Sequence, residues 1–126
     1  MKKIRGFIEK TGTGFSACAD DFPVCTTGDD LAEIRSNMVE AMNLYYEETD
    51  PKKVISEEDL NLRLDLASFF LYYKVINAKA FSKRLGMNQS LLAQYIKGIK
   101  KPSKAQTQRI LRGVQQLGKE LAEIEF

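Results

Sequence analysis

Residues 77–99 read NAKAFSKRLGMNQSLLAQYIKGI, and their spacing decides the fold expected for the second half of the chain. Asn77 and Asn88 are residue types that cap helices, and each precedes a segment with apolar residues at helical spacing. Gly86 stands between the segments, where a tight turn needs a left-handed backbone. Gly98 is placed to end the second segment. The pattern predicts two short helices joined by a turn, the second beginning at Asn88.

The residues between these signals meet the packing demands of a helix-turn-helix unit. Ser82 is the small residue expected where the two helices cross. Alanine is more usual there, but a serine hydroxyl can bond back to the preceding turn. The apolar core is predicted at Phe81, Leu85, Met87, Leu92, Tyr95 and Ile96. An αα-hairpin that binds nothing would satisfy the same spacing, so the functional prediction depends on the solvent-facing residues.

Charged residues divide the chain into two halves of opposite sign. Residues 1–65 hold 8 Lys+Arg against 14 Asp+Glu, a net charge of −6. Residues 66–126 hold 11 Lys+Arg against 3 Asp+Glu, a net charge of +8, and no acid lies between Asp65 and Glu120. An ordinary lysine-rich surface has interspersed acids, so this segment favours polyanion binding. We therefore expect two domains, 1–65 and 66–126, with different tasks.

The exposed face of the second predicted helix carries side chains suited to reading DNA. Glutamine pairs bidentately with adenine, and serine contacts either kind of base. The N-terminal residues of a recognition helix are those that reach base edges. The predicted base-reading residues are therefore Gln89, Ser90 and Gln94. The residues expected to hold the DNA backbone are Asn88, Lys79, Lys97, Lys100, Lys101 and Lys104.

A further helix is expected after Pro102, with Ser103 as its N-terminal cap. Its apolar positions share one face and would complete the small core; they are Ile110, Leu111, Val114, Leu117 and Leu121. The end of this helix could also form part of a dimer contact.

The segment LGMNQSLLAQYIKGIKKPS at 85–103 resembles the helix-turn-helix of Xre/Cro-type repressors. The shared features are the turn glycine, one Gln at the start of the second helix, another Gln one turn on, and the Gly-x-x-x-Pro exit. The resemblance implies that Gln89, Ser90 and Gln94 occupy base-reading positions. It also implies a homodimer or higher homo-oligomer that reads two half-sites on double-stranded operator DNA.

The first half predicts a small α+β domain. Alternating residues predict antiparallel strands at 4–9, 15–20 and 24–27, and residues 61–65 could return as a fourth strand. A helix follows, with Asp30 as its cap, Glu33 closing a capping box, and Asp50-Pro51 as its end. Its apolar face is predicted at Leu31, Ile34, Met38, Ala41, Met42 and Tyr45.

The stretch TGDDLAEIRSN at 27–37 is similar to the HicB antitoxin family, with Gly28, Asp29 and Asn37 on the matching positions. That family implies a degenerate ribonuclease H or double-stranded-RNA-binding fold, often followed by an all-α DNA-binding domain. It implies an antitoxin that inhibits a small basic RNA-cleaving toxin of the HicA type and represses its own operon. The acids that could contact such a toxin are Asp20, Asp21, Asp29, Glu40, Glu47 and Glu48.

We expect no enzymatic activity, metal or cofactor. The chain has no His, and acids such as Asp29 and Asp30 are explained by caps and turn bonds. Cys18 and Cys25 make no known metal-ligand set and are expected to be reduced, half-buried strand residues. No apolar run is long enough to span a membrane and no signal peptide is visible, which predicts a cytoplasmic protein.

Two other functions fit the same sequence. The first is a stand-alone Xre-type transcription regulator whose N-terminal domain senses a small molecule. The second is an interaction module with no role in DNA binding.

Overall fold

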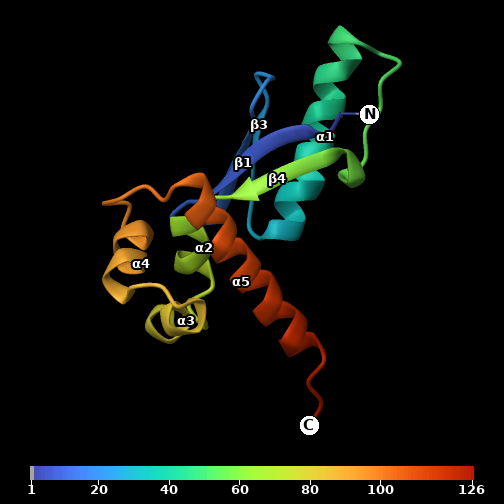
Figure 1. Cartoon of the computed structure of the whole chain (residues 1–126). Coiled ribbons are helices and arrows are strands. Elements are labelled where there is room, and N and C mark those ends of the chain that lie inside the picture. The colour runs from blue at the N-terminus through green and yellow to red at the C-terminus, as the bar shows by residue number, and fades with distance from the viewer. Residues whose placement is uncertain (1) are drawn as a thin grey trace. The chain divides into compact units, whose positions relative to one another are not determined.

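The computed structural model describes residues 2–126 and has an α+β fold (Figure 1). The chain divides into two compact units, Met1–Phe69 and Phe70–Phe126, and the division falls within α2. The elements in chain order are β1 (Ile4–Lys10), β2 (Phe15–Ala19), β3 (Cys25–Gly28), α1 (Leu31–Thr49), a 3-10 turn (Glu57–Asp59), β4 (Leu60–Leu64), α2 (Leu66–Tyr72), α3 (Ala78–Leu85), α4 (Gln89–Ile96) and α5 (Lys104–Ala122).

The first unit contains a four-stranded sheet in the order β3-β2-β1-β4. The two hairpins β1–β2 and β2–β3 are antiparallel, as predicted. The prediction of a wholly antiparallel sheet is wrong, because β4 runs parallel to β1, with Ile4 opposite Leu60 and Ile8 opposite Leu64. A parallel pair cannot be joined by a tight turn and needs a crossover connection. Helix α1 and the segment after it provide that crossover (Figure 1).

Helix α1 forms the core of this unit with one face of the sheet. The inward residues of the strands alternate with exposed ones, and Ile8 and Phe15 are each 1% exposed. The fully buried stripe of α1 repeats every four residues and consists of Ile34, Met38, Met42 and Tyr46. Tyr45, predicted on the buried face, is only partly buried, because a strict four-residue repeat places the next residue, Tyr46, inward.

The start of α1 follows from local signals. The side chain of Asp30 accepts a hydrogen bond from the backbone N–H of Glu33 at 2.8 Å, which confirms the predicted cap. Gly28 precedes it, and a Cβ atom at Gly28 would lie 2.9 Å from the backbone nitrogen of Ile34. Glycine is therefore needed at the end of β3 because the first turn of α1 passes directly over it.

A network of hydrogen bonds joins β4 directly to α2. The Asp65 N–H donates to the carbonyl of Ile8 at 3.0 Å, and the Asp65 carboxylate accepts from both the N–H and the hydroxyl of Ser68. The Ser68 hydroxyl in turn accepts from the Lys10 N–H at 2.9 Å. The buried hydroxyl of Ser68 is thus fully used, and the helix begins without an intervening loop.

The expectation for the two cysteines is wrong. Cys18 on β2 and Cys25 on β3 are directly opposite each other and form a disulfide, and both are exposed. The Ala19 N–H bonds to the Val24 carbonyl, which makes the neighbouring cysteines a non-hydrogen-bonded pair with close side chains. The sequence alone did not show this opposition because it depends on the register of the hairpin.

The second unit is all-helical and has its own small core. Phe70 from the last turn of α2 packs against Phe81 of α3, with ring centroids 6.0 Å apart. The other buried apolar side chains are Met87, Leu92, Tyr95 and Ile110. Within residues 2–126, no helix has the length and apolar character needed to cross a membrane.

Candidate nucleic-acid interface

Helix α3 begins and ends at the predicted residues. The side chain of Asn77 accepts a hydrogen bond from the Ala80 N–H at 3.0 Å, which caps its N-terminus. Gly86 ends it with φ 68°, in the left-handed region, and its N–H points back to the carbonyls of Ser82 and Lys83. This backbone conformation reverses the chain within two residues, so α4 starts close to the end of α3.

Ser82 lies in the core between the helices, at 1% exposure. Its hydroxyl donates to the carbonyl of Lys79 at 2.6 Å, which is the back-bond predicted for a serine at this position. The small side chain and the internally satisfied hydroxyl together allow the helices to pack closely without an unpaired polar group.

Helix α4 begins as the sequence predicts. The side-chain oxygen of Asn88 accepts hydrogen bonds from the N–H groups of Ser90 and Leu91, at 2.8 and 3.2 Å. Asn88 therefore fixes the N-terminus of the helix that carries Gln89 and Ser90. Any contact of this side chain with phosphate has to come from its amide nitrogen, because an amide oxygen and a phosphate oxygen both only accept hydrogen bonds.

The predicted base-reading residues lie outside the buried face of α4. Gln89 and Ser90 are exposed and Gln94 is partly buried, whereas Leu92 and Tyr95 are buried. Ser90 and Gln94 are four residues apart and therefore lie on one face, one turn above the other. The three polar side chains start from a rigid, capped helix rather than from a loop.

Two of the predicted backbone-binding lysines lie beside Gln89. A hollow of about 230 Å³ is lined by Ala78 and Lys79 of α3, by Gln89, Ala93 and Ile96 of α4, and by Lys97. The two lysines bring positive charge to the hollow that Gln89 lines. The tertiary structure thus brings together residues 79, 89 and 97, which are separated in the sequence.

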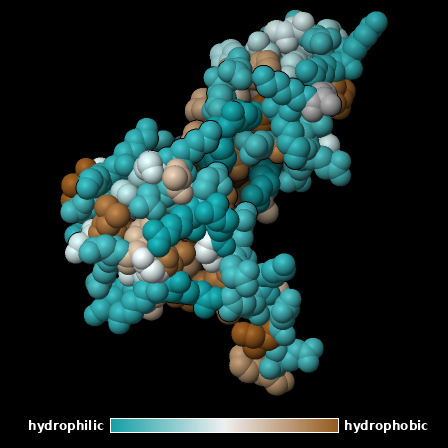
Figure 2. Space-filling view, in the orientation of Figure 1, coloured by the Kyte–Doolittle hydropathy of each residue, from teal (hydrophilic) through white to brown (hydrophobic). Residues whose placement is uncertain are grey.

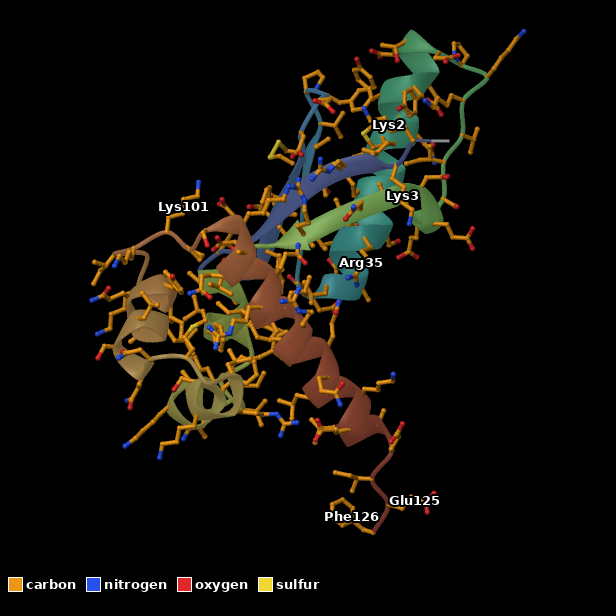
Figure 3. All side chains as sticks on the ribbon, in the orientation of Figure 1. Lys2, Lys3, Arg35, Lys101, Glu125 and Phe126 are labelled. Atoms are coloured by element: carbon orange, nitrogen blue, oxygen red, sulfur yellow. A yellow bond between two sulfur atoms is a disulfide. The ribbon has the colours of Figure 1, made fainter. Side chains whose placement is uncertain are left out.

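The remaining predicted lysines lie on the segment that leaves α4 and enters α5. Lys100 and Lys101 are in this connection and Lys104 begins α5; all three are exposed. Lys101 projects into solvent from the connection (Figure 3). Ser103 caps α5 by accepting from the Gln106 N–H at 3.1 Å, as predicted. No Asp or Glu occurs between Asp65 and Glu120, so α3, α4 and the connection to α5 carry no acid.

Two of the basic residues, Arg84 and Arg109, bind groups of the second unit itself. Arg84 forms an ion pair with Glu120, and this hydrogen-bonded guanidinium lowers the pKa of the Glu120 carboxyl. Arg109 donates to the backbone carbonyls of Leu85 and Gly86 at the turn. The sequence pattern does not single out Arg109, although an arginine in a helix that packs on a turn is well suited to bind carbonyls at the end of the preceding helix.

The acids proposed to contact a toxin are all exposed on the first unit. Asp20 pairs with Arg63 at 2.6 Å, so its charge is partly compensated. Glu40, Glu47 and Glu48 lie on α1. Asp29 lines a polar hollow of about 250 Å³ between the β1–β2 turn and the start of α1, together with threonines and Asn37.

Among residues 2–126, no three or more His, Cys, Asp and Glu side chains are grouped so that they could hold a metal ion. Searches of protein families, curated proteins and solved structures find no match to this chain.

Proposed function

We propose that the second unit is a helix-turn-helix domain that binds double-stranded DNA through α4. The observation that carries the proposal is the N-terminus of α4, where Gln89 and Ser90 are exposed and Gln89 lines one hollow with Lys79 and Lys97, in a stretch of chain that has no acid between Asp65 and Glu120. A capped helix of this length fits the major groove, and its first residues are those that reach base edges.

In this proposal the polar residues and the lysines have separate tasks. Gln89, Ser90 and Gln94 read base edges, whereas Lys79, Lys97, Lys100, Lys101 and Lys104 hold phosphates on both sides of the groove. Asn88 sets the start of the helix and thereby the height of Gln89 above the bases. Phosphate contacts supply affinity that falls with salt, and base contacts supply sequence preference.

The first unit, with its net charge of −6, supports a second task. We propose that it binds and neutralises a small basic RNA-cleaving toxin of the HicA type, and that the chain represses the operon encoding both proteins. Opposite charges speed association of the two proteins. The bound first unit would then cover the toxin surface that otherwise contacts RNA. We expect this activity in the cytoplasm, because both the operator DNA and the RNA cleaved by the toxin would be there. The first unit would neutralise the toxin by binding it and not by catalysis.

The end of α5 supports assembly into a homodimer. Leu121, near the end of α5, and Ile124 and Phe126, beyond it, are exposed, and hydrophobic residues gather at the C-terminal end of the chain (Figure 2). Covering them with a second copy would remove apolar surface from water. Two copies would also present two α4 helices, which is what a symmetric operator requires.

The polar hollow beside Asp29 supports one alternative, in which the chain is a free-standing regulator and the first unit senses a small molecule. Its lining includes Thr11, Thr27 and Asn37, side chains that can hydrogen-bond a polar ligand. The two functions differ in their partner: the antitoxin needs a basic protein, and the sensor needs only its ligand.

DNA binding is tested by selecting sequences from a random duplex pool with the purified chain and measuring affinity for the enriched sequence and a scrambled one. Enrichment of a two-fold symmetric site supports the proposal, and failure to enrich any sequence contradicts it.

The antitoxin function is tested by co-expressing the chain with the product of the adjacent reading frame. If that product alone does not arrest growth, the antitoxin proposal is wrong.

A further inference from the structure

Arg109 of α5 is bound to the turn between α3 and α4. Its Nη2 atom lies 2.8 Å from the carbonyl oxygen of Leu85 and 3.0 Å from that of Gly86, and it donates to both. The side chain is partly buried, in contrast to the exposed lysines of the proposed DNA surface. The position of its guanidinium group is therefore fixed by hydrogen bonds to the turn.

The two carbonyls at the turn have a particular need for a donor. The last carbonyls of a helix have no partner within it and carry the negative end of the helix dipole. The N–H groups of Gly86 and Met87 are already bonded, to the carbonyls of Lys83 and Ser82. A charged guanidinium that bonds to the carbonyls of Leu85 and Gly86 holds the turn from the side of α5.

The packing of α5 against α3 keeps Arg109 at this place. A Cβ atom at Gly113, one turn further along α5, would overlap Cδ2 of Leu85 and lie 3.3 Å from Cζ of Phe81. Glycine thus lets the two helices approach closely. Further along the same helix, Glu120 pairs with Arg84 of α3. Arg109, Gly113 and Glu120 are four and seven residues apart, so they share one face of α5.

We propose that Arg109 is a positioning residue for DNA recognition: it holds the turn at Leu85 and Gly86 and thereby fixes the direction in which α4 leaves it. This inference rests on the proposed DNA-binding function and deepens it. Met87 and Asn88 alone separate Gly86 from α4, so a change in the turn alters the orientation of the helix that carries Gln89 and Ser90. Arg109 does not itself contact DNA.

The chain offers a matched control for this proposal. Arg112 lies on the same helix, three residues from Arg109, and is exposed. Replacing either arginine with glutamine removes one positive charge and leaves the helix propensity of α5 almost unchanged. The variants Arg109→Gln and Arg112→Gln therefore separate the hydrogen bonds of Arg109 from its charge. Arg109→Lys keeps the charge but loses the planar fork that reaches two carbonyls.

The first measurement needs no DNA and follows amide hydrogen exchange in the full chain. We expect Arg109→Gln to speed exchange at Gly86 and Met87 more than at Leu92 and Tyr95, and Arg112→Gln to leave this ratio unchanged. A role limited to overall stability would speed exchange at all four amides by the same factor, and that result would overturn the proposal.

The second measurement compares binding to the selected and scrambled duplexes at a temperature where circular dichroism shows each variant to be folded. We expect Arg109→Gln to lose about tenfold in affinity for the selected duplex, since two charge-assisted hydrogen bonds are removed, and little for the scrambled one. Arg109→Lys should recover part of this loss. Arg112→Gln should leave the ratio of the two affinities as in the wild type.

The outcomes of the two measurements distinguish the two proposals. Equal losses on both duplexes for Arg109→Gln would identify it as a phosphate contact and overturn the positioning role while leaving DNA binding intact. A wild-type chain that enriches no duplex overturns the proposed function itself. Selective exchange at the turn together with a selective affinity loss supports both.

Discussion

At the scale of single residues, the proposed interface depends on a few side chains whose backbone is fixed by hydrogen bonds. Asn88 caps α4 with two bonds, so the helix starts at a defined residue. Gln89 is the first residue of that helix and lines one hollow with Lys79 and Lys97. A side chain that reads a base has to be positioned in this way, because a bidentate hydrogen bond tolerates little displacement.

Replacing Gln89 with alanine should weaken binding to the selected duplex by about 1–3 kcal/mol and relax the preference at one base pair. Titration of duplexes that carry each of the four base pairs at that position measures both effects. Arg112→Gln serves as the control that keeps α4 intact. Equal weakening on selected and scrambled DNA would show that Gln89 does not read a base.

Lys100 has the complementary role in the proposal, a contact with the DNA backbone. Its exposed position on the connection after α4 suits a phosphate contact, so Lys100→Ala should weaken binding to every duplex by a similar factor. The slope of the logarithm of affinity against the logarithm of salt concentration should fall by about 1. A change in base preference without a change in this slope would contradict the assignment.

A substitution at Gly86 tests the need for a left-handed backbone in the turn between α3 and α4. Its φ of 68° is unfavourable for a residue with a Cβ atom, although the nearest atom to such a Cβ would be 3.5 Å away, on Arg109. Gly86→Ala should therefore lower the free energy of unfolding by about 1–2 kcal/mol through backbone strain rather than through a clash. Urea denaturation measures the loss, and Gly118→Ala on α5, with open space at its Cβ and no positive φ, should not reproduce it.

At the scale of elements, a disulfide between Cys18 and Cys25 links strands β2 and β3 of the sheet. At the other edge of the sheet, β4 pairs with β1 in parallel. Strand β3 has only four residues and one neighbour, so few hydrogen bonds hold it. The disulfide joins it to β2 seven residues away along the chain and limits the separation of the two strands in the unfolded chain.

Reduction of this disulfide should lower the free energy of unfolding of the first unit by about 2 kcal/mol, the size expected for a short closed loop. Denaturation with and without a dithiol reductant, followed by a probe in the first unit, measures the change. The double variant Cys18→Ser, Cys25→Ser is the control and should respond identically in both conditions. An oxidised wild type no more stable than this variant would contradict the prediction.

At the scale of the whole molecule, the charges are divided between the two units, −6 before α2 and +8 after it. Because the two net charges differ in sign, the proposed basic protein and the proposed polyanion would be attracted to different units. The exposed apolar residues at the end of α5 add a third surface, at the terminus marked by Glu125 and Phe126 (Figure 3).

That third surface predicts the assembly state. The double variant Leu121→Asp, Ile124→Asp places two charges on the proposed dimer contact and should convert the dimer into a monomer, because the charges would be desolvated there. Light scattering measures the mass before and after the change, and circular dichroism checks that the fold is kept. A wild-type chain that stays monomeric when bound to its selected duplex would exclude the dimer.

Much of the fold could be predicted because its signals are local. Asn77, Asn88 and Ser103 cap the helices at which they were expected, and Gly86 takes the predicted left-handed conformation. Each of these depends on hydrogen bonds or backbone sterics within about four residues, so the sequence carries the whole of the relevant physics. The split in charge is equally a property of the sequence alone.

Only the tertiary structure decided the features that depend on strand register or on contacts between distant segments. The parallel pairing of β4 with β1, the opposition of Cys18 and Cys25, and the bonds of Arg109 to the turn each need a register or a helix packing that no local pattern specifies. Pairing between distant strands is decided by burial of whole faces, since a shift of one residue moves every side chain to the other side. The residues that hold α4 in place are therefore found in the structure, whereas those that start it were already visible in the sequence.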